Sequence, residues 1–328
     1  MFFIFGGLCV RRGGRKNGYK KKECAASHQV SDHSLFFATR LLAYNHFMEI
    51  RTLEKTTIGE ITSTFNEAFQ GYFIPLVFTE ESMSTKLKSE GIKLQYSVGA
   101  FEKDRLVGFI LHGFDVINSM KTIYNAGTGV VADFRGRGIT KALYEFAIPM
   151  LMKEGIYKHL LEVIENNLPA LHVYEKMGFR RTRKLQAFKG KPLASSDDAY
   201  AIRHLPTIPE EAFAFSEMVS AWQNSLASVR RDMENHQCIG AFRENELIGF
   251  AAFVAATGRI KQLSVHPHHR RKGVGTALLS ATRQRSMADQ LIATNIDEAY
   301  EPGVHFLAAS GFTGFLGLYE MELDVVQS

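Results

Sequence analysis

Gly129–Leu143 reads GVVADFRGRGITKAL, and a related stretch, SVHPHHRRKGVGTAL, returns at Ser264–Leu278. In both stretches, apolar residues typical of the end of a strand precede a turn, a glycine-rich segment with arginines, and the apolar start of a helix. One copy of this pattern arises readily by chance, but two copies at equivalent places in a long repeat do not. The pair therefore indicates that the chain contains the same fold twice.

Each glycine-rich turn has the chemistry of an anion-binding site. Glycine lets the backbone turn tightly without a Cβ, so several N–H groups can converge on one anion. The helix N-terminus that follows adds unsatisfied donors, and arginine can grip a phosphate through paired donors. We therefore predict two pyrophosphate-binding turns; the alternative is a capped turn whose arginines are only solvated. The predicted residues are Arg135, Gly136, Arg137, Gly138, Ile139 and Thr140 in the first turn, and Arg270, Arg271, Lys272, Gly273, Val274 and Gly275 in the second.

Neither turn matches two familiar phosphate-binding motifs. Lys141 and Leu278 stand where the third glycine of the dinucleotide-binding fingerprint would be, and the spacing of a Walker A loop is absent from both turns.

The repeat itself extends well beyond the turns. Gly99–Phe101 returns as Gly240–Phe242, and the Gly-Phe pair at 178–179 returns at 311–312. Two copies of one domain of ordinary size are therefore expected.

The repeat predicts a domain organisation and a fold class. We expect a basic leader at 1–47, copy one at 48–190, a linker at 191–198 and copy two at 199–328. Each copy is expected to run from a short strand through a helical region, three strands, the glycine-rich turn with its helix, a strand and a helix to a final strand. This order predicts an α/β or α+β fold, with one mixed, mostly antiparallel sheet per copy flanked by helices.

Copy one carries R-x-x-G-x-T at Arg135–Thr140, followed by N-x-x-A-x-x-x-Y-x-x-x-G-F at Asn167–Phe179. This combination resembles the GCN5-related N-acetyltransferase superfamily, and the resemblance covers both copies, roughly residues 48–328. Thr140 departs from the small glycine or alanine that is usual at its position. Copy two has a complete loop, but Tyr300 and Leu307 stand where copy one has its asparagine and tyrosine.

The resemblance implies a donor and a mechanism. In copy one, acetyl-CoA would lie between two splayed strands, and its pantetheine arm would pair with strand 125–131, which includes Val131. In copy two, the equivalent strand ends at Val265. An acceptor amine would attack the thioester directly, and the backbone N–H near Val130 would polarise the carbonyl. Tyr174 would protonate the departing thiolate, and Asn167 would hold the cofactor arm. Packing beside Phe179 is the alternative role for the tyrosine, and capping of a helix is the alternative role for the asparagine.

The general base is left open among three residues, since an ammonium acceptor must lose a proton before it attacks. Glu162 is preferred because it lies beside the expected cleft, and its alternative is a charge on the solvated face of the sheet. Glu165 lies just beyond, His112 lies on an earlier strand, and a relay through water is also possible.

The helical region ahead of Gly99 is expected to shape the acceptor pocket, as the resemblance implies. Phe65, Phe69 and Tyr72 fall on one face of a predicted helix, either as a core stripe or as a pocket wall. Copy two is 11 positions shorter in this region. We therefore predict that turnover occurs in copy one and that copy two has a supporting role.

Composition limits the partners. The 328 residues are 45% hydrophobic, no apolar run approaches the ~20 residues of a membrane span, and three cysteines are too few for a disulfide framework or a metal site. Residues 1–47 hold eight Lys/Arg and two Asp/Glu, a charge of +6, so the remainder carries −1 of the total +5. We expect no nucleic-acid, membrane or metal partner, a cytoplasmic location, and a monomer or homodimer acting on a small-molecule or peptide amine.

The leader and the function each retain alternatives. Residues 1–47 are interpreted as an extension upstream of a natural start at Met48, with a basic arm or an organelle-targeting segment as the rival interpretations. The predicted function is transfer of an acetyl group from acetyl-CoA to a primary amine. An acyl-CoA-binding sensor and a transferase for another acyl group are the alternatives.

Overall fold

The computed structural model of the protein describes residues 48–192 and 200–325. The predicted leader at 1–47 and most of the predicted linker lie outside the described residues. Copy one contains, in order, β1 (Met48–Thr52), α2 (Ile58–Ala68), α3 (Glu80–Ser89), β2 (Val98–Glu102), β3 (Arg105–Ile117), β4 (Met120–Val130), η2 (Ala132–Phe134), α4 (Ile139–Lys153), β5 (Lys158–Ile164), α5 (Leu168–Lys176) and β6 (Arg180–Gly190).

Copy two repeats this order with a reduced helical region. Its elements are β7 (Ala201–His204), η3 (Glu210–Phe215), η4 (Trp222–Asn224), α6 (Leu226–Arg231), η5 (Met233–Asn235), β8 (Gln237–Arg243), β9 (Glu246–Val254), β10 (Arg259–Val265), η6 (Pro267–His269), α7 (Val274–Arg285), β11 (Leu291–Asp297), α8 (Glu301–Ala309) and β12 (Phe312–Asp324). Copy two is 11 positions shorter here, and the short α6 and three 3-10 turns stand where copy one has the longer helices α2 and α3.

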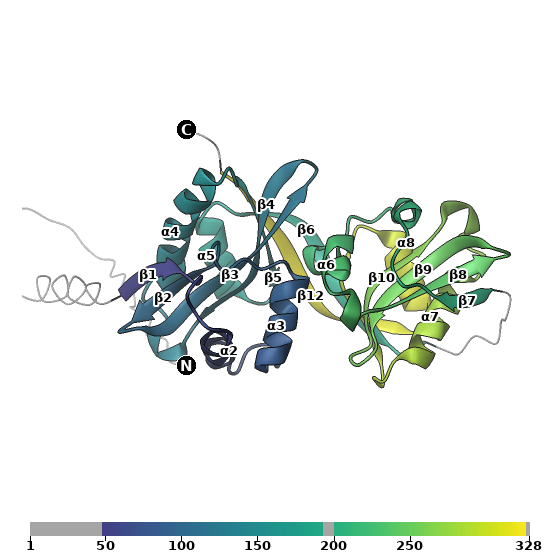
Figure 1. Ribbon diagram of the computed structural model, residues 1–328, viewed down its shortest axis with the longest axis horizontal. Helices are drawn as coiled ribbons and strands as arrows, with labels where there is room; N and C mark the ends of the chain where they lie inside the picture. The colour runs from purple at the N-terminus through teal and green to yellow at the C-terminus, as the bar shows by residue number, and fades with distance from the viewer. Residues whose placement is uncertain (1–47, 193–199, 326–328) are drawn as a thin grey trace, which may run out of the picture. The chain divides into compact units, whose positions relative to one another are not determined.

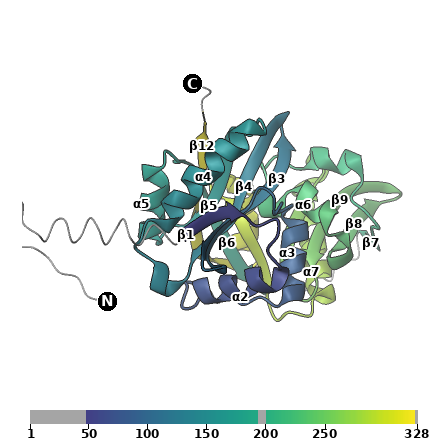
Figure 2. The same cartoon turned by 60° about the vertical axis from the view of Figure 1, so that its left-hand side comes forward.

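The strands of both copies form one sheet of 12 strands in the order β1-β2-β3-β4-β5-β12-β6-β11-β10-β9-β8-β7. Among the described strands, only β4 with β5 and β10 with β11 pair in parallel. The mixed, mostly antiparallel fold with flanking helices is therefore confirmed. The two expected sheets are joined, however, because each copy gives its last strand to the other: β12 lies beside β5, and β6 lies beside β11 (Figures 1 and 2).

Local sequence explains where the elements of copy one begin and turn. Thr57 caps α2 by accepting a hydrogen bond from the Glu60 N–H at 3.2 Å, and the Glu60 carboxylate accepts one from the Thr57 N–H at 2.9 Å. The hairpin between β2 and β3 turns through Lys103 and Asp104, both with positive φ, as a two-residue turn of this twist requires. Pro169 occupies the first turn of α5, where a missing N–H costs nothing.

Apolar side chains cover both faces of the copy-one half of the sheet. On one face α4 and α5 pack over Ile123 and Leu161, and on the other α2 and α3 pack over Phe109. The expected aromatic helix face is only partly helical, because α2 ends at Ala68 and Tyr72 follows the helix. Its rings still stack in series, Phe65 to Phe69 at 4.4 Å and Phe69 to Tyr72 at 5.0 Å between centroids. No helix in the two described ranges has the length and apolar character to cross a bilayer.

Candidate active site and its second copy

The first glycine-rich turn lies on the surface between β4 and α4. Gly136 and Gly138 both adopt a φ of +75°, and Gly138 is the N-cap of α4. A Cβ added at either glycine would meet nothing within 4 Å, so open space borders this backbone. The N–H groups of the first turn of α4, which begins at Ile139 and Thr140, have no partners within the helix. The turn therefore presents free donors to an open space, as an anion site requires.

The turn of copy two has the same construction with one difference. Gly273 caps α7 with a φ of +85°, and open space also borders it. Arg271 occupies the place of Gly136 and has a φ of +60°, a conformation that a non-glycine residue rarely adopts. The other predicted members, Arg270 and Lys272 in the turn and Val274 and Gly275 at the start of α7, lie where the sequence places them.

The first arginine of each turn is engaged by the protein itself. The Arg135 Nε donates to the Val130 carbonyl at 3.0 Å, and one Nη donates to the Ala68 carbonyl at 2.7 Å. Arg270 makes the equivalent bonds to Val265 and Phe215 in copy two. These bonds tie the turn to the preceding strand and to the helical region. A paired grip on phosphate by either arginine would require these bonds to be exchanged. Arg137 is exposed on the turn, and one of its Nη atoms donates to the Asp133 carbonyl at 2.6 Å.

The two strands beside the first turn separate towards it. β4 and β5 pair only from Thr122 with Lys158 to Asn125 with Leu161. Beyond Asn125 the ladder with β3 contains a bulge, since Leu111 faces Gly127 and His112 faces Asn125. The last five residues of β4 therefore have a backbone edge that β5 no longer occupies.

That open edge includes the N–H predicted to polarise a carbonyl. The Val131 N–H donates to the Val107 carbonyl at 2.9 Å, on the β3 side. Successive residues of a strand direct their N–H groups to opposite sides, so the Val130 N–H points into the gap. Arg135 reaches the Val130 carbonyl on the same side. The Val130 N–H is therefore a hydrogen-bond donor that points into the gap between β4 and β5.

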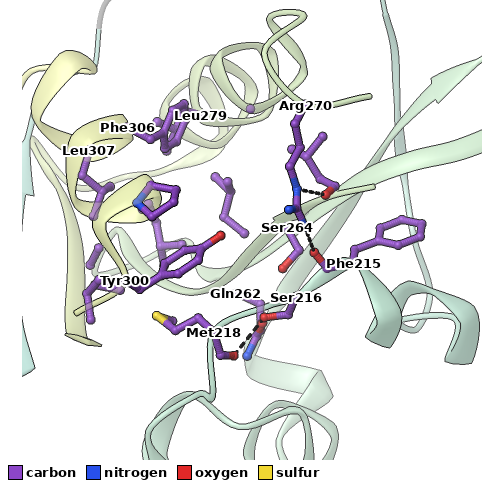
Figure 3. A pocket seen from close by; sticks show the side chains of 18 of the residues that line it. Phe215, Ser216, Met218, Gln262, Ser264, Arg270, Leu279, Tyr300, Phe306 and Leu307 are labelled. Carbon is purple, nitrogen blue, oxygen red and sulfur yellow. Dashed lines mark hydrogen bonds between the residues drawn. The ribbon is translucent and has the colours of Figure 1, made fainter. Parts of the chain in front are cut away.

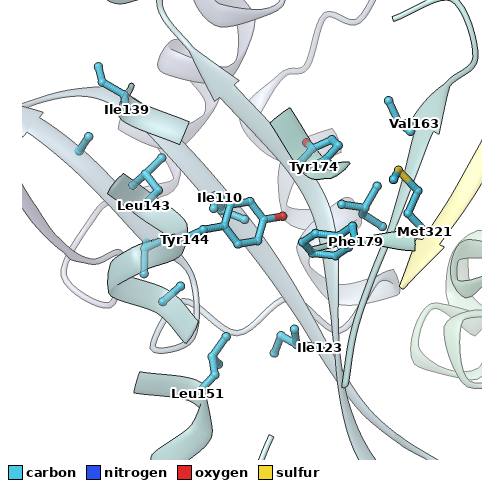
Figure 4. Packing of buried hydrophobic residues seen from close by; sticks show 14 of the residues in the cluster. Ile110, Ile123, Ile139, Leu143, Tyr144, Leu151, Val163, Tyr174, Phe179 and Met321 are labelled. Atoms are coloured by element: carbon cyan, nitrogen blue, oxygen red, sulfur yellow. The ribbon is translucent and has the colours of Figure 1, made fainter. Parts of the chain in front are cut away.

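Tyr174 lies on α5 and is 8% exposed. Its ring contacts Phe179 and Tyr144 with centroids 5.8 and 6.2 Å apart, so the expected packing role is present (Figure 4). Burial raises the pKa of Tyr174 above its usual value, although hydrogen bonds with Thr128 and Asn125 oppose the rise. The hydroxyl is therefore protonated at neutral pH and lies beside β4, which leaves the predicted proton-donor role open to it.

Asn167 is the N-cap of α5 and performs two tasks. Its Oδ1 accepts from the Ala170 N–H at 3.3 Å, which is the capping role offered as its alternative. Its Nδ2 donates to the Tyr72 hydroxyl at 3.3 Å. The aromatic segment after α2 therefore contacts the residue that was predicted to hold the cofactor arm.

Glu162 lies at the junction of the two copies rather than on a solvated sheet face, so that alternative was wrong. It faces Glu320 across the β5–β12 pairing, and the Asn295 side chain of β11 donates to its carboxylate. Its Oε1 is shielded from solvent and has no hydrogen-bond partner in the described part of the chain. Burial, followed by the charges of Glu320 and Glu90, raises the pKa of Glu162 to about 8.

The other two candidate bases are less suitable. The His112 ring is 1% exposed, and its Nδ1 contacts the Tyr96 carbonyl at 2.8 Å. Burial lowers the pKa of His112 to about 4. Glu165 forms a partly exposed ion pair with Lys184 at 3.7 Å.

Copy two contains a cavity of about 610 Å³ between β10, β11, α7 and α8. Figure 3 shows Tyr300, the N-cap of α8, with Phe306 and Leu307 of α8 on one wall, and Ser264 and Arg270 on the opposite one. The strands splay early here, because β10 and β11 pair only at Arg259 and Ile260. The phosphate turn of copy two therefore opens into a preformed space, but Leu307 supplies no hydroxyl at the place of Tyr174.

Sequence reasoning missed several polar residues around these sites. Asn125 and Thr128 surround the Tyr174 hydroxyl. Trp222 of copy two stacks on Tyr124 of copy one with centroids 5.1 Å apart, and its Nε1 donates to the Glu90 carbonyl at 2.9 Å. The only signal for Trp222 was its being the sole tryptophan, and no motif marks the others.

The sequence profile of the acetyltransferase (GNAT) family matches the chain twice, over residues 60–179 and 201–312. Because these matches cover more than half of the chain, the protein belongs to the acetyltransferase (GNAT) family, and each copy has its own match. The family that the sequence resembles, and the acyltransferase class that this resemblance implies, are thereby confirmed. Members of this family use acetyl-CoA as the acyl donor.

Two curated relatives share part of the sequence. N-alpha-acetyltransferase MAK3 of Arabidopsis thaliana is 30% identical over 114 residues, which is 34% of this chain and 58% of that protein. N-alpha-acetyltransferase 30 of Schizosaccharomyces pombe is 27% identical over 95 residues, which is 29% of this chain and 63% of that protein. The chain thus spans about three fifths of the length of these relatives.

Solved structures share the fold over most of the chain. A tandem GNAT protein from the clavulanic acid biosynthesis pathway aligns with a TM-score of 0.67 at 17% identity, covering 86% of this chain and 99% of that one. A GCN5-related N-acetyltransferase from Sphaerobacter thermophilus aligns with a TM-score of 0.61 at 14% identity, covering 86% of this chain and 96% of that one. At these identities the likeness shows the fold alone.

Proposed function

We propose that the protein is an acetyl-CoA-dependent N-acetyltransferase that acetylates a primary amine in copy one. The observation that carries the proposal is the coincidence in copy one of an open phosphate turn, a splayed strand edge and a buried tyrosine hydroxyl. The N–H groups at Gly138 and the start of α4 border open space, since a Cβ on Gly138 would meet nothing within 4 Å, and such a turn fits a pyrophosphate. Acetyl-CoA supplies the thioester carbon that the amine attacks.

The residues of copy one divide the chemistry between them. The Val130 N–H lies at the gap and stabilises negative charge on the thioester oxygen, a type of contact that contributes about 10²–10³ in rate where it has been measured. Tyr174 donates its proton to the sulfur as the carbon–sulfur bond breaks. Glu162, whose pKa of about 8 allows it to lose and accept a proton near neutral pH, receives a proton from the acceptor ammonium directly or through water.

Peptide N-termini are the first acceptors to test, because the two curated relatives are named N-alpha-acetyltransferases. A panel of free and N-blocked peptides, polyamines and amino acids, with acetyl-CoA and a thiol-release assay, identifies the acceptor. Turnover with free peptides and none with N-blocked peptides supports this acceptor class. Turnover with polyamines alone argues against it.

The copy that performs turnover is tested with two matched pairs of variants. Aspartate and asparagine both tolerate a positive φ, but only aspartate places a negative charge beside the phosphates. Gly138→Asp should therefore weaken coenzyme A binding and turnover at least about tenfold more than Gly138→Asn, a difference of about 1.4 kcal/mol. If Gly273→Asp lowers turnover in this way and Gly138→Asp does not, the working donor site lies in copy two.

A binding role without catalysis is the second candidate, and the cavity of copy two favours it for that half. The cavity adjoins a phosphate turn, but Leu307 cannot donate a proton. Calorimetry on the intact protein distinguishes the two candidates. Two equivalents of bound coenzyme A, with turnover sensitive only to Gly138→Asp, indicate one catalytic and one binding copy.

A further inference from the structure

Lys261 lies at the point where the two central strands of copy two separate. Ile260 faces Phe253 and Gln262 faces Ala252, so Lys261 is the extra residue of a bulge in β10. The parallel pairing with β11 has already ended at Ile260. Lys261 also lines the cavity of about 610 Å³ that opens to the phosphate turn. Lys261 therefore lies at the vertex of the splayed strands, and its side chain can turn into the cavity once the Nζ releases the Gln223 carbonyl.

The length of strand between Lys261 and the end of β10, just before the turn, suits a coenzyme A ligand. Val265, at the end of β10, is four positions after Lys261, or about 13 Å along the strand at ~3.3 Å per residue. An extended pantetheine arm can follow this open strand edge from the turn to the vertex. Its thioester end would then lie beside Lys261. Copy one has Ala126 at the equivalent position, so the built-in amine is particular to copy two.

The surroundings of Lys261 favour its nucleophilic form. Its Nζ donates to the Gln223 carbonyl at 2.9 Å and lies near Arg259. Burial and the Arg259 charge lower the pKa of Lys261 to about 7, while Glu90 and Asp232 act in the opposite direction and Lys86 reinforces the fall. A large share of the side chain is therefore neutral at physiological pH, with a free lone pair.

We propose that copy two acylates itself: an acyl-CoA bound at its phosphate turn transfers its acyl group to Lys261. The Nζ lone pair forms an amide bond to the thioester carbon, the carbon–sulfur bond breaks, and the thiolate takes up the proton that the nitrogen loses. The product is a neutral acyl-lysine in the cavity and free coenzyme A. The proposal shares its donor class with the proposed function, but it assigns a separate site and acceptor.

The experiment incubates the full-length protein with acetyl-CoA and locates the label by intact-mass and peptide mass spectrometry. We expect one acetyl group, on Lys261, at a rate that does not change with protein concentration, because the transfer occurs within one molecule. Gly273→Asp should slow labelling at least about tenfold relative to Gly273→Asn, since charge beside the turn repels the phosphates. Tyr174→Phe should label normally, which separates this reaction from turnover in copy one.

Lys261→Arg should abolish the single label while keeping a long side chain with hydrogen-bond donors, and the exposed lysine Lys272 serves as an internal control in every sample. Thermal melting verifies that the variant folds; if it does not, the paired Gly273 variants still decide the question. Labelling spread equally over Lys272 and other lysines, or equal in both Gly273 variants, overturns the proposal. So does a labelling rate that rises with protein concentration. Absence of amine turnover with Lys261 labelling intact refutes only the function proposed for copy one.

Discussion

The proton-donor role of Tyr174 makes a sharp prediction for Tyr174→Phe. The substitution removes one hydroxyl and leaves the ring contacts with Phe179 and Tyr144, at 5.8 and 6.2 Å, in place. Loss of hydrogen bonding by a buried hydroxyl costs about 1 kcal/mol, which lowers the melting temperature by roughly 2–4 °C. Loss of a general acid should lower kcat by about 10²–10³, or roughly 2.7–4.1 kcal/mol. The effect on turnover should therefore far exceed the effect on stability.

The assay is thiol release under saturating acetyl-CoA and acceptor, with coenzyme A affinity measured separately by calorimetry. Affinity should be unchanged, because the hydroxyl is not needed for phosphate contacts. The pKa of Tyr174 is raised by burial, so wild-type activity should fall only at strongly alkaline pH, as the phenol loses its proton. The variant should lack that alkaline limb.

Tyr144→Phe is the matched control, because its buried hydroxyl accepts from Asn125 at 2.7 Å in the same cluster. It should lose a similar amount of stability with a much smaller effect on kcat. Turnover of Tyr174→Phe within about threefold of wild type, less than 1 kcal/mol, would refute the proton-donor role. Equal losses in the two variants would assign the effect to packing of the cluster.

Three further predictions concern the junction, the base and the leader. Trp222→Ala should destabilise the protein by about 3–5 kcal/mol in denaturant titrations, because it empties a buried aromatic site between the copies; a loss below about 1 kcal/mol would contradict this. The pKa of Glu162 is raised to about 8, so turnover should rise as pH increases through 8, and Glu162→Gln should abolish that limb in a pH–rate profile. The same raised pKa means that wild type loses stability relative to Glu162→Gln as pH rises through 8, and melts at pH 6 and 9 test the sign. A chain that begins at Met48 should keep its melting temperature and turnover; a drop in either shows that residues 1–47 contribute.

Local patterns were sufficient for the order of elements and for both turns. Glycines at 136, 138 and 273 fall where a positive φ is needed, and Pro169 falls in the first turn of a helix, so their positions are legible without tertiary information. The contacts of Glu162 could not be predicted from the sequence, because Asn295 and Glu320 come from strands more than 130 positions away. Distant strand pairing leaves no signal in a short window of sequence.

The special position of Lys261 had the same cause. Its neighbours in the sequence mark it as an ordinary strand residue, and only the register of β10 against β9 reveals the bulge. The depressed pKa of its amine follows first from burial against η4, which is a consequence of tertiary packing, and then from the charge of Arg259 on the same strand. Side-chain chemistry was thus predictable where it depends on a local turn and unpredictable where it depends on assembly.

The reciprocal placement of β6 and β12 has a consequence for how the protein unfolds. Arg183 of β6 bonds Glu320 of β12 at 2.7 Å and forms an ion pair with Asp297 of β11 at 3.3 Å, so each half contributes a strand that the other half needs. Removing either half exposes the unpaired edges of β5 or β11 to water. Calorimetry should therefore show one cooperative transition for both halves, with a calorimetric enthalpy equal to the van't Hoff enthalpy, rather than two independent meltings. A destabilising substitution in one half should therefore lower the stability of both halves, because the two are expected to unfold together.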